Sequence, residues 1–336
     1  MGRLLSELRS FSKEKICFSF LIENLDLLSD DIKNSFLLDY EAALSQKRSL
    51  QSLLFGSSLV SLKKDVSSKT IWFFWFQGLN DAPDVVRISL KSWVFMNPDY
   101  DVVFLDSSNL HTYFPFWDSL SLSNLRLKIA HKSDFLRTFL IYYYGGIWVD
   151  ATTFCFKPLS FWLPGVLERS SLFFPKQKKT CKDRIIKNWL LAGVKGNPLA
   201  KLLLEDLYSY IFQYRANPLR MINGPDYMHK IKLDPGASTL DYFTNTCLKV
   251  FEGQGVFPYF FYHYVYNNVV LNSKDGSEVK QVASFITGFP DIIPENKRAA
   301  ITDSVFVSKQ SYRKRHTDSD EYRERRELVL RLIESF

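Results

Sequence analysis

Residues 130–159 read AHKSDFLRTFLIYYYGGIWVDATTFCFKPL and join a helix, a pair of glycines and a short strand in direct succession. The spacing of the apolar residues predicts the helix over 125–144. The glycines at 145–146 end this helix, because glycine adopts the left-handed cap conformation without steric cost. The apolar run at 147–150 then predicts a buried strand, whose last residue is the carboxylate Asp150.

Upstream, the sequence predicts two further strands. The six apolar residues at 71–76, IWFFWF, are too few for a helix and rich in aromatics, which favours a buried strand. Helical spacing follows at 84–93, and the run YDVVFL at 100–105 predicts the next strand. A strand, a helix and a strand within about 35 residues indicate an α/β unit.

Chemistry-bearing residues follow these predicted strands, and ligands of open α/β sheets bind at the carboxyl ends of strands. We therefore expect Gln77, Gly78 and Asp150 to lie at one edge of a sheet. Asp134 and Arg137 are three residues apart and share a face of the predicted helix. Carboxylates accept hydrogen bonds from sugar hydroxyls or hold a divalent cation, and arginine binds diphosphate. The set suits a nucleotide-sugar, although each residue alone also fits an ordinary ion pair or strand end.

Helices are also expected outside this core. Residues 1–60 carry Leu, Ile and Phe near helical spacing, and further helical segments are predicted at 184–192 and 198–215. The tail at 313–336 is predicted to form a basic, then amphipathic helix. The sequence contains no internal repeats.

Composition limits the classes of function. Of the 336 residues, 46% are hydrophobic and 24% charged, which excludes global disorder and indicates two domains or one large one. Aromatic residues make up 16%, and they can fill a core or stack on sugar rings and bases. The net charge of +7 suits an anionic partner, such as a diphosphate or an acidic membrane surface, and equally suits simple solvation.

The cysteines and the longest uncharged stretch indicate neither a metal site nor a membrane span. Cys17, Cys155, Cys181 and Cys247 lack metal-ligand spacing, and four cysteines are ordinary for a reduced cytosolic protein. Residues 254–273 have the length of a transmembrane helix, but proline, histidine and asparagines interrupt them, so we expect core and pocket lining. We expect a cytoplasmic protein, either free in the cytoplasm or attached peripherally to the inner face of the cell membrane.

Two blocks of motifs resemble one known family. The first is S-D-x-x-R at 133–137 with G-G-I-W-V-D at 145–150, and the second is IWFFWFQGLNDAP at 71–83 with SWVFMNPDYDVVFLD at 92–106. They are similar to the sugar-binding DXD region of glycosyltransferase family 32, above all to bacterial capsular polysaccharide synthesis proteins, and distantly to clostridial glucosylating toxins. Weaker similarities lie at 188–189 (NW), 224–225 (GP) and 307–312 (VSKQSY).

The resemblance implies a GT-A type α/β fold, which is a Rossmann-like nucleotide-binding sheet with helices on both faces. It implies a retaining glycosyltransferase that moves a hexose from a UDP-sugar to a lipid-linked surface polysaccharide, either capsule or O-antigen. The implied division is an N-terminal helical region at 1–62, a nucleotide-sugar-binding core at 70–160, an acceptor-binding part at 161–312 and a basic amphipathic helix at 313–336.

The resemblance also implies roles for single residues. Trp75 would stack on uracil or another base, and Asp150 would be the first carboxylate of the DXD motif. Asp134 and Arg137 would position the sugar, and with Asp150 they are the catalytic candidates. The implied donor site as a whole comprises Trp75, Gln77, Gly78, Ser133, Asp134, Arg137, Gly146, Asp150 and Lys309.

The chain departs from the family at the second DXD position, where Thr152 replaces the carboxylate that normally binds the metal. A neutral hydroxyl is a poorer cation ligand than a carboxylate, so Asp150 and Thr152 would hold Mn²⁺ or Mg²⁺ more weakly. In the alternative, a basic side chain neutralises the leaving diphosphate; the candidates are Lys309, Arg313 and Lys314.

An acceptor cleft would require residues that pack on or hydrogen-bond to sugar rings. The candidates are Asn188, Trp189, Gly224, Pro225 and the aromatic run 257–266, and an equal alternative is that these residues form plain core. The implied acceptor is a glycan or a polyprenyl-diphosphate-linked oligosaccharide. The basic tail would then meet an anionic membrane, unless it packs back on the domain.

Two other functions share the same motifs. One is a toxin-like glycosyltransferase that modifies a protein, and the other is a non-catalytic protein that binds nucleotide-sugars or glycans, with Thr152 marking lost activity. Nucleic acid is not an expected partner, because only the basic pI suggests it and no recognition motif accompanies it.

Overall fold

The computed structural model describes residues 29–56, 62, 66–168, 170–176, 184–223, 242–274, 277 and 305–334. The chain forms two compact units whose segments alternate along the sequence. The first unit comprises residues 1–64, 111–138 and 202–272, and the second comprises 65–110, 139–201 and 273–336. The four consecutive segments expected from the sequence are a division of another kind and stay a prediction.

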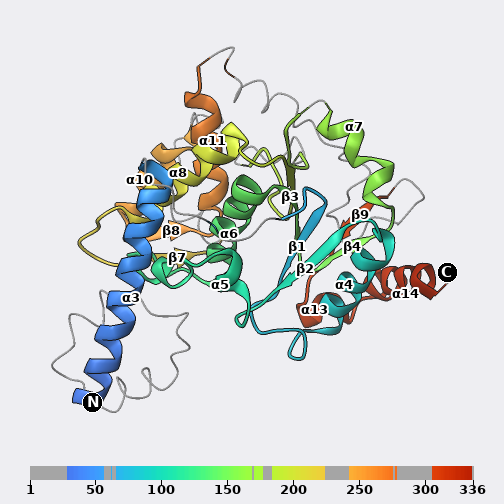
Figure 1. Cartoon of the computed structure of the whole chain (residues 1–336), viewed down its shortest axis with the longest axis horizontal. Coiled ribbons are helices and arrows are strands. Elements are labelled where there is room, and N and C mark those ends of the chain that lie inside the picture. Colours follow the sequence, from blue (N-terminus) through green and yellow to red (C-terminus); the bar gives the residue numbers. More distant parts are fainter. Residues whose placement is uncertain are drawn as a thin grey trace. The chain divides into compact units, whose positions relative to one another are not determined.

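A sheet of parallel and antiparallel strands forms the centre of the second unit (Figure 1). Its strands follow the order β2 (Asp101–Leu105), β1 (Thr70–Phe74), β3 (Gly146–Asp150), β6 (Leu190–Gly193) and β5 (Leu172–Phe173). The first three are parallel, whereas β6 is antiparallel to β3 and β5 is antiparallel to β6. The three predicted strands are thus confirmed, except that β1 ends at Phe74 and leaves Trp75 and Phe76 in the following turn.

The register of the parallel strands brings their carboxyl ends level. Phe74, the last residue of β1, pairs with Leu105 of β2 and with Asp150 of β3. Whatever follows β1 and β2 therefore lies at the same sheet edge as Asp150.

Helix α4 (Asp84–Met96) packs on the short strand β4 (Thr153–Cys155) in the second unit. The Ser89 hydroxyl and the Trp93 indole both donate to the Thr153 carbonyl, at 2.5 and 2.6 Å. Strand β4 also pairs, antiparallel, with β9 (Val307–Lys309). Segments far apart in the sequence are thereby fixed beside the end of β3.

The C-terminal tail forms two helices, α13 (Lys314–Thr317) and α14 (Asp320–Glu334), rather than one. Helix α14 lies against α4 (Figure 1) and buries Tyr322 and Val329 in the core of the second unit. Leu328 and Leu332, on the apolar face expected of the amphipathic tail, pack against that core, and Phe336 lies outside the described residues. Of the two alternatives for the tail, the structure shows packing on the domain.

The predicted helix at 184–192 is wrong. This segment instead contains an isolated bridge between Ile186 and Lys176 and the start of β6. All four residues of β6 are buried, and a short continuous apolar run of this kind cannot be told from a buried helix by its composition. The short helices η3 (Leu159–Phe161) and α7 (Leu163–Leu167) precede β5 and β6 in the chain. Helix α8 (Pro198–Phe212) follows β6 and confirms the helix predicted at 198–215.

The first unit is mainly helical. Its elements include α3 (Asp30–Phe55), η2 (Asp118–Leu122), α10 (Asn245–Glu252), α11 (Phe261–Asn272) and the parallel pair β7 (Arg220–Ile222) and β8 (Val256–Pro258). Short helix α5 (Leu110–Tyr113), α6 (Ile129–Tyr144) and α8 each cross the boundary between the units in the sequence.

Two predictions about this unit can be compared with the structure. Helix α6 begins at Ile129, four residues later than predicted, because Leu125 instead bridges to Leu219. The aromatic stretch at 254–273 is core, with Phe257, Phe261 and Tyr262 fully buried. Among the described residues, no helix has the length and apolar character needed to cross a membrane.

Candidate functional site

The level strand ends of the second unit gather several predicted site residues. Trp75 directly follows β1, and its amide donates to the carbonyl of Leu105 at 3.0 Å. Gly78 has φ +83°, and a side chain there would lie 3.5 Å from Oδ2 of Asp106, the residue after β2. Asp150 ends β3 at the same edge. The expected meeting of these strand ends is confirmed, whereas their roles toward a ligand stay predictions.

Both carboxylate oxygens of Asp150 accept hydrogen bonds. Trp148 Nε1 donates to Oδ1 at 3.0 Å, since residues two apart on a strand point to the same face. Lys309 Nζ forms an ion pair of 2.7 Å with Oδ2. The side chain of Asp150 is 25% exposed and that of Lys309 is 21% exposed, so solvent reaches the ion pair only in part.

Lys309 reaches Asp150 because strand pairing fixes its backbone. In the register of β4 and β9, Lys309 lies opposite Thr153, and the next amide, of Gln310, donates to the Thr152 carbonyl at 2.7 Å. The side chain of Gln310 is buried and bonds to His316 at 3.1 Å. The structure therefore brings together two predicted site residues that lie 159 positions apart.

The residues at the DXD position fit a divalent cation poorly. Thr152 is buried, and its hydroxyl, a neutral group, donates to the Gln310 carbonyl at 3.1 Å. The carboxylate of Asp150 already faces the positive charge of Lys309. Within the described part of the chain, no group of three or more His, Cys, Asp or Glu residues could hold a metal. Mg²⁺ and Ca²⁺ sites use oxygen ligands, usually including carboxylates.

Trp75 is half-buried and contacts Tyr312, an exposed residue shortly after β9. The indole N–H of Trp75 is buried and has no hydrogen-bond partner among the described residues. Tyr312 also lines a pocket of about 500 Å³ at the start of α4, where Asp84 and Arg326 form an ion pair of 2.9 Å. Aromatic surface and an open pocket thus adjoin the end of β1.

The environments of the other candidate donor residues differ. Gln77 is exposed in the turn after β1. Gly146 has φ +92°, and a side chain on it would collide with the carbonyl oxygen of Thr70. The requirement for glycine at 146 therefore comes from strand packing between β3 and β1. Arg313 and Lys314, the other candidate cations, are both exposed.

The other predicted cluster belongs to the first unit, on the first turns of α6. Arg137 and Asp134 form an ion pair of 3.3 Å, and their side chains are only 5% and 9% exposed. Arg137 also donates to the carbonyl and hydroxyl oxygens of Ser133, at 3.1 and 3.2 Å. The predicted pairing of Asp134 with Arg137 is confirmed, and their role on ribose and donor sugar stays a prediction.

More polar side chains are buried beside this pair than the sequence revealed. Lys132 is 2% exposed, donates to the Ser121 hydroxyl at 3.0 Å and lies over the Trp117 ring. Thr138 shares a hydrogen bond of 3.3 Å with Tyr262. Burial of charged and polar groups is costly, and such groups gather at functional sites.

His131, near the start of α6, is buried as a neutral ring. Burial, aided by the charge of Lys128, lowers the pKa of His131 to about 4. Its Nδ1 accepts from the Lys128 amide at 3.1 Å, and the rings of Phe257, Tyr259 and Phe261 surround it. A neutral imidazole in this setting packs and caps the helix start.

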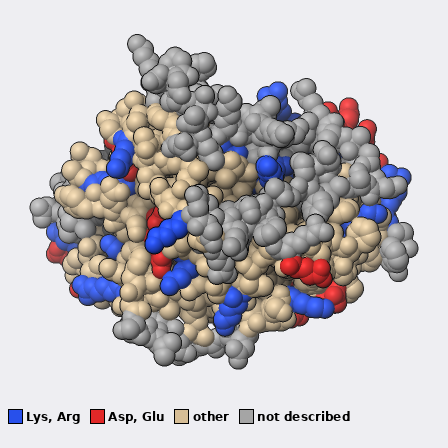
Figure 2. All heavy atoms as spheres, turned by 90° about the horizontal axis from the view of Figure 1, so that it is seen from above, with Lys and Arg blue, Asp and Glu red and all other residues tan. Residues whose placement is uncertain are grey.

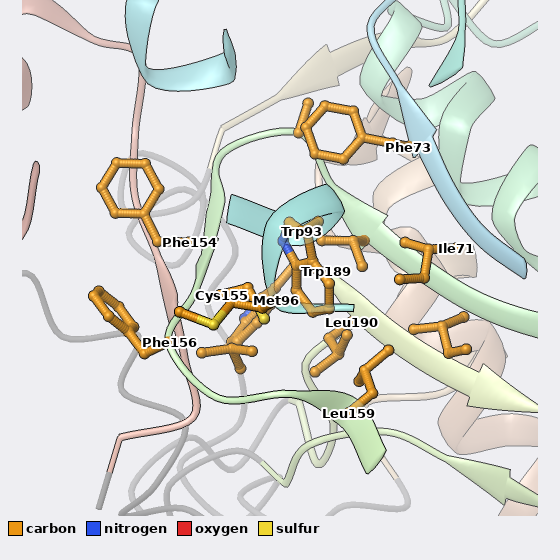
Figure 3. Close-up of a cluster of buried hydrophobic side chains, with 14 of the residues drawn as sticks. Ile71, Phe73, Trp93, Met96, Phe154, Cys155, Phe156, Leu159, Trp189 and Leu190 are labelled. Atoms are coloured by element: carbon orange, nitrogen blue, oxygen red, sulfur yellow. The ribbon is translucent and has the colours of Figure 1, made fainter. Parts of the chain in front are cut away.

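The predicted acceptor residues are mostly core. Trp189 is 4% exposed and lies in the hydrophobic cluster beneath the sheet, with Trp93, Cys155 and Leu190 (Figure 3). Asn188 beside it is half-buried. In the aromatic run, Tyr262 and Tyr264 are fully buried, whereas Tyr259 is 37% exposed; Gly224 and Pro225 lie outside the described residues. Trp189 therefore offers little surface on which a sugar ring could pack.

Cys155 offers no nucleophile. It is fully buried in the same cluster, and burial raises the pKa of its thiol to about 12. Cys247 is also buried, while Cys17 and Cys181 lie outside the described residues.

Sequence reasoning missed Asp106, Trp148 and Tyr312 near the strand ends of the second unit, and the buried Lys132 on α6 in the first unit. For Asp106 the signal was present, since it follows a predicted strand in the same way as Asp150 follows its own. Trp148 could have been found by the two-residue period of a strand. Tyr312 and Lys132 owe their places to tertiary packing, for which the sequence carries no local signal.

One face of the described residues carries charged side chains of both signs. Figure 2 shows Lys and Arg in several separate groups on this face, with Asp and Glu near some of them. The described basic residues visible there do not form one continuous patch.

Known proteins are similar to this chain over parts of its length. It is 27% identical over 154 residues to "O-glycosyltransferase braB" of Annulohypoxylon truncatum, which is 41% of this chain and 37% of that relative. It is 28% identical over 108 residues to "Glycosyltransferase afumC" of Aspergillus fumigatus, which is 28% of this chain and 27% of that relative. The chain thus spans about a third of the length of these curated relatives.

Among solved structures, "PaToxG Glycosyltransferase" is similar with a TM-score of 0.33 and 16% identity, over 77% of this chain and 99% of that one. This likeness is too weak to carry an argument. The model of the family described as "Capsular polysaccharide synthesis protein" matches residues 36–219, which is more than half of the 336 residues. The chain therefore belongs to the capsular polysaccharide synthesis protein family.

Proposed function

We propose that this chain is a glycosyltransferase that moves a hexose from a UDP-sugar to a surface polysaccharide under construction. The observation that carries the proposal is the level edge of β1, β2 and β3, where Trp75 and Gly78 follow β1 and Asp150 ends β3. The names of the two relatives, both glycosyltransferases, and the description of the family support it.

In this proposal the fold is of the GT-A type, and the donor lies across the carboxyl ends of the parallel strands. The base packs on the indole of Trp75, whose buried N–H lacks a partner among the described residues. Gly78 leaves room for the nucleotide to approach the sheet edge. The diphosphate lies at Asp150 and Lys309, where the ammonium group balances phosphate charge.

The proposed reaction breaks the bond between the anomeric carbon and the β-phosphate oxygen. The bonding electron pair goes to that oxygen, and the acceptor hydroxyl oxygen forms a new bond to the anomeric carbon from the same face. The hydroxyl proton goes to the departing phosphate oxygen, so the products are the glycosylated acceptor and UDP, with retained configuration. Fixed positive charge at the leaving group lowers the barrier to such a step.

The proposed acceptor is a polyprenyl-diphosphate-linked oligosaccharide at the inner face of the membrane, in keeping with the capsule description of the family. The exposed ring of Tyr259 is the remaining candidate of the aromatic run for packing on a glycan. The exposed basic residues Arg313 and Lys314 suit contact with anionic lipid headgroups.

Screening the full chain against a panel of nucleotide-sugars tests this proposal. We expect a UDP-sugar to raise the melting temperature and to be hydrolysed slowly, with UDP detected by mass spectrometry. With an acceptor, NMR of the product should show the anomeric configuration of the donor. Binding without any turnover would favour a non-catalytic nucleotide-sugar-binding protein, and a panel without binding would overturn the donor site.

A further inference from the structure

We propose that Lys309 takes the place of the divalent cation at the DXD position, so that this chain binds and cleaves its donor without a metal. The inference rests on the proposed function, because it concerns how the same site handles the diphosphate. Two observations carry it: the ion pair between Lys309 and Asp150, and the neutral residue at position 152.

The charge balance of the site explains why the two features belong together. Two carboxylates and one divalent cation sum to zero charge, and so do one carboxylate and one ammonium group. Without the second carboxylate, a divalent cation at Asp150 would leave an excess positive charge. With the neutral Thr152 at the second position, the ammonium group of Lys309 alone balances the carboxylate of Asp150, so the site is neutral before the donor arrives.

The hydrogen bonds of Asp150 leave a metal little opportunity. Its Oδ1 accepts from Trp148 at 3.0 Å and its Oδ2 accepts from Lys309 at 2.7 Å. A cation that used Asp150 as a ligand would have to displace the ammonium group or lie within a few ångströms of a like charge. An ammonium group has three N–H donors, so Lys309 can hold Asp150 and a phosphate oxygen together.

The backbone around Lys309 is fixed, as a replacement for a bound ion requires. Val307 and Ser308 of β9 are fully buried, and β9 pairs with β4 directly after Asp150. Gln310 is anchored on both sides, by its amide to the Thr152 carbonyl and by its side chain to His316. The positive charge thus stands in place before the leaving group develops its negative charge, which is the arrangement that favours catalysis.

Donor binding in the presence and absence of metal tests the inference. We expect UDP to bind the full chain in EDTA with the same Kd, within about twofold, as with added Mn²⁺, by isothermal titration calorimetry. Electron paramagnetic resonance of Mn²⁺ should show no stoichiometric site on the chain without UDP. A UDP affinity that rises more than tenfold with Mn²⁺, or a tight Mn²⁺ site on the chain alone, would overturn the inference while leaving the proposed donor site standing.

Substitution of Lys309 separates its role from simple surface charge. Lys309→Gln should weaken UDP binding and slow donor hydrolysis by tenfold or more, in EDTA as well as in Mn²⁺. Lys91→Gln removes an exposed lysine of α4 in the same unit and should change neither. Equal UDP binding by Lys309→Gln and the wild type, with the melting temperature preserved, would contradict the proposal.

Rebuilding the carboxylate pair gives a converse test. Thr152→Asp combined with Lys309→Ala restores two acids and removes the built-in cation, so we expect Mn²⁺ binding and donor hydrolysis that depends on Mn²⁺. Because Thr152 is buried, the melting temperature is measured first, and Lys309→Ala alone serves if the double variant does not fold. Partial rescue of Lys309→Ala by Mn²⁺ would support the inference; full activity of this variant in EDTA would overturn it. If no nucleotide binds the wild type under either condition, the proposed function itself fails.

Discussion

The ring of Tyr312 lies edge-on to the ring of Trp75, with 5.6 Å between the ring centroids and 76° between the ring planes. Trp75 is the residue directly after β1, whereas Tyr312 comes from the segment after β9. The contact holds the indole from one side at the sheet edge where the donor is proposed to bind. Aromatic contacts of this geometry prefer a defined orientation, so Tyr312 positions Trp75.

Replacement of Trp75 by alanine should weaken the binding of UDP about tenfold or more. The physical reason is that stacking of a base on an aromatic ring contributes about 1–3 kcal/mol. Tyr312→Ala should have a smaller effect, because it removes the positioning contact and leaves the indole. Isothermal titration calorimetry of each variant with UDP measures both changes.

Tyr214→Ala is the matched control for these aromatic deletions. Tyr214 is 86% exposed and belongs to the first unit, so its loss should leave the Kd for UDP unchanged. If Trp75→Ala binds UDP as tightly as the control does, the base does not lie on Trp75.

Removal of only one partner of the ion pair between Asp134 and Arg137 should destabilise the chain strongly. Both side chains are buried, and removal of one partner of a buried pair costs about 3–5 kcal/mol, because the other charge stays behind. Arg137→Met should therefore lower the melting temperature strongly. The double variant Asp134→Leu with Arg137→Met should recover much of that loss, since it removes both charges.

Asp320 and Arg323 provide a control with the same three-residue spacing on a helix. In their ion pair of 2.8 Å, the side chain of Arg323 is 62% exposed and that of Asp320 is 85% exposed, so Arg323→Met should cost no more than about 0.5 kcal/mol. Donor hydrolysis by the double Asp134/Arg137 variant then separates stability from function. Restored stability with lost hydrolysis would support the predicted role on the sugar, whereas restored hydrolysis would show a purely structural pair.

The parts of this fold that the sequence could predict are those with local signals. Glycines 145–146 and the apolar run after them predicted the end of α6 and the start of β3, because the left-handed conformation and a short buried strand both leave a local pattern. Strand β6 left no such pattern. All four of its residues are buried, and a short apolar run does not by itself distinguish a buried strand from a buried helix.

The candidate site divides in the same way. Asp134 and Arg137 could be paired from their spacing on a helix, since three residues bring side chains to one face. The partner of Asp150 could be named from the sequence only as one of several basic residues. Its selection as Lys309 depends on the pairing of β4 with β9, which is a long-range contact without a local sequence signal.

Stability should fall as the pH drops below about 6.5, because His131 is neutral in the folded chain. Its pKa is lowered to about 4, from 6.5 in an unfolded chain, so the unfolded state binds the proton first. The stabilisation is fully present above pH 6.5 and is lost progressively between about pH 6.5 and pH 4, amounting to about 3 kcal/mol. Chemical denaturation at a series of pH values measures this change.

His131→Asn supplies the control for the pH dependence. Asparagine keeps a side-chain acceptor that can replace Nδ1 toward the Lys128 amide, but it does not titrate. The slope of stability against pH between 4 and 6.5 should be smaller in this variant than in the wild type. An unchanged slope would show that other groups, and not His131, cause the loss.

Gly146→Ala should destabilise the second unit by about 3 kcal/mol or more. Position 146 has φ +92°, a conformation that alanine rarely adopts, and a methyl group there would collide with the Thr70 carbonyl in β1.

Gly165→Ala is the matched control, because Gly165 lies in helix α7 with nothing within 4 Å of the added methyl group. There alanine should stabilise by up to about 1 kcal/mol, since it restricts the unfolded chain and favours the helix. Melting temperatures of the two variants should thus move in opposite directions, and a Gly146→Ala variant as stable as the wild type would show that β3 and β1 do not approach as closely as the register requires.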